Sequence, residues 1–70
     1  MPIYQFQVVE DYQSPDVRWT YLSDDDAAKR YGRLLIKDFK SHGGKFAAHT
    51  NMEIKDDQGR RVAILPFEDI

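Results

Sequence analysis

Apolar and polar residues alternate at the start of the chain, and this pattern predicts a β-strand over Pro2–Val9. Tyr4, Phe6 and Val8 share one face of that strand, while glutamines occupy the other face. A strand with one apolar and one polar face is typical of a sheet that is covered on a single side.

A second alternating stretch predicts a strand over Val17–Leu22, in which Val17, Trp19 and Tyr21 share a face. The preceding segment, Glu10–Asp16, ends in a Ser-Pro-Asp triplet that is typical of turns. We therefore expect a hairpin with a seven-residue loop, and we place Trp19 and Tyr21 in the core rather than on a stacking surface.

The period changes between Ser23 and His42, where apolar residues recur at spacings of three and four and predict the single α-helix of the chain. Ser23 is the expected N-cap, with Asp26 completing a weak capping box. Gly43 suits the left-handed residue that follows a helix. Gly32 lies at the edge of the apolar face, where it would allow a strand to approach closely. The apolar face consists of Ala27, Ala28, Tyr31, Leu34, Leu35 and Phe39.

Two more strands are predicted after the helix, over Met52–Lys55 and Arg60–Leu65, and the acidic turn Asp56–Gly59 joins them. Pro66 ends the last strand because it has no amide hydrogen to donate to a ladder. Residues 68–70 are expected to fray.

The predicted order is β-β-α-β-β, which indicates an α+β fold with a four-stranded antiparallel sheet and one helix across one face. The pattern does not fix the order of the strands in the sheet. The expected core consists of Tyr4, Phe6, Val8, Trp19, Tyr21, Leu34, Leu35, Phe39, Ile54, Val62 and Ile64. A smaller apolar patch on the second face of the sheet would consist of Ile3, Val9, Leu22, Ala63 and Leu65.

The composition restricts the classes of protein that this chain can belong to. Its 70 residues correspond to one domain with a thin core, and it contains no cysteine for a disulfide framework or a cysteine-based zinc site. No stretch reaches the length of a membrane span, and the first residues lack the pattern of a signal peptide, so we expect a cytoplasmic protein that does not bind membranes. A thin core without staples favours self-association, most simply as a homodimer.

The charge is polarised along the chain although the formal net charge is only −2 at pH 7. Six basic residues and one acidic residue lie between Lys29 and Lys45. We expect Asp25 and Asp26 to pair with the helix cations four residues later. The candidate partner-binding row consists of Lys29, Arg30, Arg33, Lys37 and Lys40. With the first two paired, the cations left for a partner are Arg33, Lys37 and Lys40. The alternative is that the row is simply a solvated helix face.

Candidate metal ligands are few, and the sequence predicts no cofactor. Asp38, His42 and His49 would supply three ligands if the chain brought them together, but we interpret the histidines as a solvated helix end and a solvated loop, because structural zinc sites usually need four closely spaced ligands. The segment Asp56–Gly59 lacks the length and the closing glutamate of a calcium loop, so we interpret it as a turn. No pattern for nucleophilic or acid–base catalysis is present, and we expect no enzyme activity.

Three stretches carry a family resemblance: the opening MPIYQFQV, the helix entry Leu22–Ala28, and the closing segment Ile54–Phe67, with its acidic turn and its Leu-Pro-Phe end. In these stretches the chain resembles a family of short uncharacterised proteobacterial proteins that is classed as a domain of unknown function. Two features depart from the family pattern: Gln7 stands where a histidine is expected, and a glycine expected before the second strand is missing. The resemblance implies a fold and a bacterial source, and it implies no activity.

Two functions are compatible with these features. The first is a non-enzymatic protein–protein interaction module that forms a homodimer and binds a protein partner. The second is a nucleic-acid-associated protein that uses the basic face of the helix, although the net negative charge argues against a general nucleic-acid binder.

Overall fold

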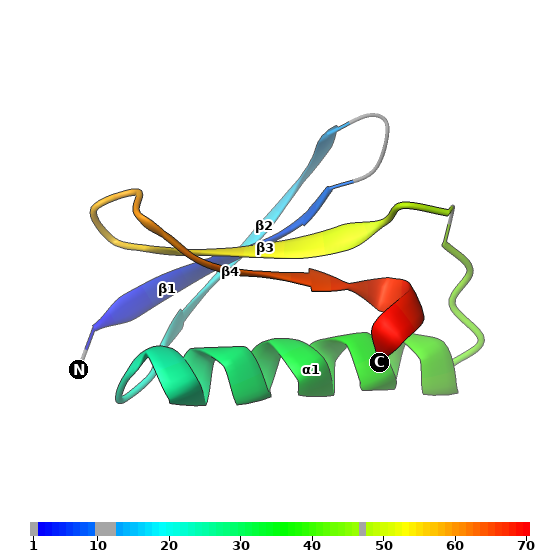
Figure 1. The fold of residues 1–70 in the computed structure, drawn as a ribbon, viewed down its shortest axis with the longest axis horizontal. Helices are drawn as coiled ribbons and strands as arrows, with labels where there is room; N and C mark the ends of the chain where they lie inside the picture. The colour runs from blue at the N-terminus through cyan, green and yellow to red at the C-terminus, as the bar shows by residue number, and fades with distance from the viewer. Residues whose placement is uncertain (1, 10–12, 47) are drawn as a thin grey trace.

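A computed structural model of the chain describes residues 2–9, 13–46 and 48–70, with the backbone alone for residues 13–16. The elements are β1 (Ile3–Val9), β2 (Gln13–Tyr21), α1 (Asp25–Ser41), β3 (Asn51–Asp56), β4 (Arg61–Pro66) and a short 3₁₀ helix (Phe67–Asp69). The predicted β-β-α-β-β order and α+β class are confirmed, and the helix lies across one face of a single sheet (Figure 1). In the described part of the chain, no helix has the length and apolar character needed to cross a membrane.

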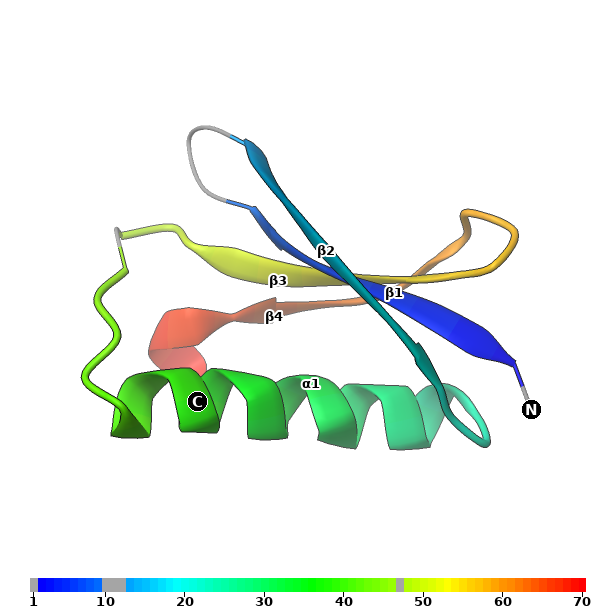
Figure 2. The same cartoon turned by 180° about the vertical axis from the view of Figure 1, so that it is seen from behind.

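The four strands are ordered β2-β1-β3-β4, and each pairs antiparallel with its neighbour. The two hairpins are therefore joined through β1 and β3 in the middle of the sheet, and β2 and β4 form its edges. The helix contacts β3 and β4 (Figure 2). The helix covers the half of the sheet formed by β1 and β2 less completely, and a groove lies between that half and the helix.

Strand β2 begins at Gln13, so the prediction of a loop over residues 13–16 and of a seven-residue hairpin connection is wrong; residues 10–12 lie outside the described part. The register shifts between Gln7 and Val9 of β1, which pair with Val17 and Gln13 respectively. The extra β2 residues in this irregular stretch include Pro15, and proline is tolerated at an edge strand or a bulge because no ladder there needs its amide hydrogen.

The N-cap of the helix lies one residue later than predicted. Asp24, not Ser23, is the N-cap: its backbone is extended, and its side chain accepts a hydrogen bond of 2.8 Å from the amide of Ala27. At the other end, the prediction for Gly43 is confirmed by its φ of 75°.

The buried face of the helix is rotated about the helix axis relative to the predicted apolar face. The buried residues of α1 are Ala28, Gly32 and Ile36, whereas Leu34 is 62% exposed and Phe39 is 40% exposed. The prediction for Gly32 is confirmed: a Cβ atom there would lie 2.8 Å from Cδ1 of Leu65. The missing side chain of this glycine therefore leaves room for Leu65 and Ile54 of the sheet.

The core forms between the helix and one face of the sheet. Tyr4, Phe6 and Ile54 are buried as predicted, and the half-buried Val8, Leu35 and Val62 pack against them. The rest of the buried core consists of Ala28, Ile36, Met52, Leu65 and Phe67. The expected core residues that are exposed instead are Trp19, Tyr21, Leu34, Phe39 and Ile64.

The face of β2 is the reverse of that predicted. In β4 the reversal is partial, because Val62 still packs against the core beside a register shift between Ile54 and Lys55. Leu65 is buried and Ile64 is exposed, while Leu22 and Ala63 pack against the core, so these residues do not form the expected second-face patch. Alternation shows which residues share a face, but it does not show which of two mixed faces meets the helix.

The chain end packs against the core instead of fraying. Phe67 is buried, its amide donates to the backbone oxygen of Thr50 at 3.0 Å, and the 3₁₀ helix begins at this residue. The rings of Phe39 and Phe46 meet the ring of Phe67 edge-on at centroid distances of 5.8 and 5.4 Å. Phe67 thereby anchors the segment that the sequence suggested would be loose.

Candidate functional site

The basic row of the helix divides into free and occupied cations. Arg30, Arg33 and Lys37 are exposed, and within the described residues no carboxylate forms an ion pair with any of them. Lys29 is half-buried. Lys40 is half-buried too: its ammonium group donates to the backbone oxygen of Ile70 and lies 5.2 Å from the ring centroid of Phe46. Lys40 is therefore already used within the fold.

The expected i,i+4 pairs of the helix are absent among the described ion pairs. Asp25 is instead bound by the hydroxyl of Tyr4 at 2.8 Å and by the guanidinium of Arg60 at 3.1 Å. No ion pair in the described part of the chain joins Asp26 to Arg30. Asp25 is the first residue of the helix, where Tyr4 and Arg60 reach its carboxylate. These two partners take the place of the expected ion pair with Lys29.

These contacts shift the pKa values of the groups involved. Hydrogen bonds from Tyr4 and Arg60 hold the pKa of Asp25 below its usual range, and Arg60 does the same for Asp56. Burial, together with the hydrogen bond to Asp25, raises the pKa of Tyr4 to about 12. The cluster joins β1, the helix and the β3–β4 turn, so its evident role is structural.

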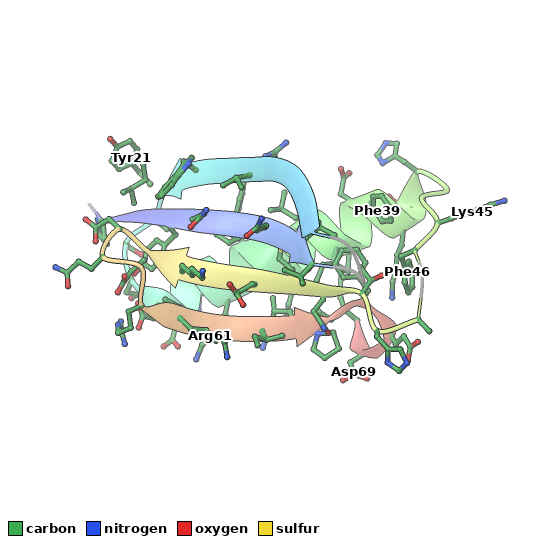
Figure 3. All side chains as sticks on the ribbon, turned by 90° about the horizontal axis from the view of Figure 1, so that it is seen from above. Tyr21, Phe39, Lys45, Phe46, Arg61 and Asp69 are labelled. Atoms are coloured by element: carbon green, nitrogen blue, oxygen red, sulfur yellow. The ribbon has the colours of Figure 1, made fainter. Side chains whose placement is uncertain are left out.

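The uncovered face of the sheet carries the most unusual surface of the molecule. Val17, Trp19 and Tyr21 of β2 are exposed, Trp19 by 52% and Tyr21 by 66%. They pair directly with Gln7, Gln5 and Ile3 of β1, and directly opposed residues of antiparallel strands point to the same face. Figure 3 looks onto this face, with Tyr21 standing at the outer edge of the sheet. We call the exposed side chains Val17, Trp19 and Tyr21 the β2 apolar row.

Charged residues on the same face pair with one another and are partly neutralised. Glu53 of β3 forms ion pairs with Lys55 at 3.1 Å and with Arg61 of β4 at 3.4 Å. Arg61 is labelled on β4 in Figure 3, beside the turn. These three groups leave one net positive charge on the middle of the sheet face next to the β2 apolar row.

The prediction that Trp19 and Tyr21 lie in the core is wrong, because the other set of β2 side chains faces the helix. Arg18 and Thr20 alternate with the β2 apolar row, and they pair with Phe6 and Tyr4, so it is the polar set that lies on the helix side. Pro15 indicates an edge strand. An edge strand that extends beyond the covering helix need not bury its apolar set.

Asp38 and His42 lie together at the end of the helix, but His49 does not complete a group of three candidate metal ligands in the described part of the chain. The ring Nδ1 of His42 lies 2.8 Å from the backbone oxygen of Asp38 and 3.3 Å from its carboxylate, which ties the histidine to the helix end. His49 lies in the following loop with a φ of 70°. Over the described residues, no three His, Cys, Asp or Glu side chains are grouped so as to hold a metal ion.

Comparisons of the chain with protein-family models, with curated proteins and with solved structures found no match. The resemblance to the proteobacterial family of unknown function therefore stays a prediction, and the functional argument depends on the surfaces of this molecule alone.

Proposed function

We propose that the protein is a non-enzymatic interaction module that associates with a second copy of itself through the uncovered face of its sheet, and that it binds a protein partner as this dimer. The observation that carries the proposal is the exposure of Trp19 and Tyr21 side by side on that face. Tryptophan and tyrosine supply large contact areas at interfaces, and they are enriched among the residues that dominate binding energy.

The charge layout supports a pairing of like with like. A two-fold interface brings the same patch of both subunits together, so a strongly charged patch would repel its copy. Here Glu53 is paired with Lys55 and Arg61, and the β1 residues between them and the β2 apolar row are the uncharged Gln5 and Gln7. Each copy therefore brings only one unbalanced positive charge on this face, which is a weak repulsion between exposed groups.

Sedimentation velocity from micromolar to millimolar protein tests this proposal. We expect a shift from monomer to dimer with concentration, and we expect Trp19→Gln with Tyr21→Gln to abolish that shift while leaving the monomer folded. Leu34→Gln is the matched control, because it removes an exposed apolar side chain from the helix, away from the sheet face. A chain that stays monomeric throughout the range contradicts the proposal.

A nucleic-acid-associated role is the second candidate, and it is favoured by the exposure of Arg30, Arg33 and Lys37 without carboxylate partners in the described residues. Binding of single strands usually combines cations and aromatic stacking in one groove. Here the free cations lie on the helix, whereas Trp19 and Tyr21 lie on the opposite, sheet side. This separation is why the protein-binding function is placed first.

Titration of labelled DNA and RNA at low and moderate salt separates the two functions. Binding through the helix weakens with salt and is lost in Arg33→Glu with Lys37→Glu, whereas Lys55→Glu on the sheet face leaves it unchanged. Absence of binding at low salt removes the nucleic-acid role.

A further inference from the structure

The covered side of the sheet contains a groove that the helix does not fill. The β1–β2 hairpin rises away from the C-terminal half of the helix (Figures 1 and 2). The space between them is a groove of about 380 Å³. Its lining includes Phe6, Val8, Leu35, Phe39, Met52 and Arg18. A groove of this size lies in the range of small-molecule sites.

Arg18 is the one charged residue among the described residues that line the groove. It pairs in register with Phe6 of β1, so its side chain is on the helix side of the sheet, at the mouth of the groove. Within the described part of the chain, no carboxylate forms an ion pair with Arg18. A guanidinium group stays charged at every physiological pH, and its fork of donors matches a carboxylate.

We propose that this groove binds a monocarboxylate with an apolar tail, of the medium-chain fatty acid class, whose carboxylate pairs with Arg18 and whose tail lies against Phe6, Leu35 and Met52. The charge of the arginine and the apolar walls select both ends of such a ligand. Val17 at the end of the β2 apolar row also borders the groove, whereas Trp19 and Tyr21 lie on the opposite face of the sheet and do not line it. The inference does not depend on the proposed dimer.

The two ends of the ligand make separate, measurable contributions. Each methylene group transferred from water into the apolar groove should tighten binding about fourfold, until the groove is full. The pairing of a carboxylate with the exposed guanidinium of Arg18 should contribute about two- to fivefold in affinity, because solvent screens the pair. The matching alcohol fills the same apolar walls and lacks this second contribution.

Calorimetric titration of the full chain with hexanoate, octanoate, decanoate and octanol, together with amide chemical-shift mapping, tests the proposal. We expect affinity to rise along the carboxylate series, octanol to bind more weakly than octanoate, and the shifts to concentrate on β1, β2 and the second half of α1. Arg18→Gln should reduce octanoate binding to the level of octanol and leave octanol unchanged. Arg33→Gln, an equally exposed arginine on the helix, should change neither.

A second variant examines the walls of the groove. Val8→Phe narrows the groove and should weaken octanoate and octanol alike. The monomeric Trp19→Gln and Tyr21→Gln variant should still bind octanoate, so failure of the dimer and failure of the groove are distinguishable. Octyl phosphate binding as tightly as octanoate would assign the site to organic anions in general and overturn the carboxylate preference. Absence of binding in a folded chain, or octanoate binding that survives Arg18→Gln, overturns the site itself.

Discussion

The hydroxyl of Tyr4, near the start of β1, donates a hydrogen bond of 2.8 Å to Oδ1 of Asp25, the first residue of α1. The other oxygen of Asp25 accepts a bond of 3.1 Å from Arg60, and Arg60 also donates at 2.9 Å to Asp56 at the end of β3. One carboxylate thus connects the first strand, the helix and the last hairpin. These contacts hold the start of the helix against the sheet.

Replacing Asp25 should change the titration of Tyr4. Burial and the bond to Asp25 raise the pKa of Tyr4 from 10.0 to about 12, so the neutral phenol is favoured in the folded state. The associated stability is complete below pH 10 and is lost as pH rises towards 12. We expect Asp25→Asn to move the pKa of Tyr4 back towards 10, measured by ultraviolet absorbance against Tyr4→Phe. Asp26→Asn, in the same helical turn, should leave it unchanged.

The carboxylates of Asp25 and Asp56 should make the fold sensitive to acid. Their pKa values lie below the ordinary 3.8 because Tyr4 and Arg60 stabilise the charged forms. A lowered folded-state pKa contributes stability that is complete above the unfolded value and is lost as pH falls through the folded value, here below about pH 4. Urea unfolding of the wild type should therefore weaken steeply in that range.

The matched variants for the acid experiment are Asp56→Asn and Asp57→Asn, neighbours in one turn. Asp56 accepts bonds from the amides of Gln58 and Arg60 as well as from the arginine side chain, whereas Asp57 is exposed. We expect Asp56→Asn to lower the urea midpoint at pH 7 and to flatten its fall in acid. A comparable loss in Asp57→Asn would show that the paired contacts are not the cause.

Gly32 should tolerate little growth in its side chain. A Cβ there would lie 2.8 Å from Leu65 Cδ1 and 3.0 Å from Ile54 Cδ1, both ends of flexible side chains. Alanine improves helix propensity by about 1 kcal/mol, which offsets a small rearrangement, so Gly32→Ala should be close to neutral in thermal unfolding. Gly32→Val overfills the contact and should cost about 1–3 kcal/mol. Combining it with Leu65→Val should recover part of the loss, because the two sites share one contact.

Local chemistry predicted much of this fold. Spacing, capping residues and turn residues located the helix and the closing hairpin to within one or two residues, because those features depend on near neighbours in the chain. Strand order and the covered face were not predictable in the same way. They depend on the pairing of β1 with β3, whose partners are 42 or more residues apart in the sequence, and on how far the helix reaches under β2.

The same distinction between local pattern and tertiary packing applies to the candidate surfaces. The exposure of Arg33 and Lys37 follows from helical periodicity, so the sequence located them correctly. The occupation of Lys40 by Ile70 and the exposure of Trp19 and Tyr21 follow from tertiary packing. An alternating strand has two faces, and only the three-dimensional arrangement determines which of them the helix covers.

The rotation of the helix gives a direct test of the observed packing. Ile36 is fully buried and Leu34 is 62% exposed, although the sequence assigned Leu34 to the core. Truncating Ile36 removes packed methyl groups and leaves a cavity, so Ile36→Ala should cost about 2–5 kcal/mol. Leu34→Ala should stay within about 0.5 kcal/mol of wild type, because the side chain is already in water and both residues are good helix formers. Thermal unfolding measures the difference, since 1 kcal/mol corresponds to about 4–8 °C in a domain of this size. The reverse order of stabilities would mean that the helix packs with the face that the sequence pattern first suggested.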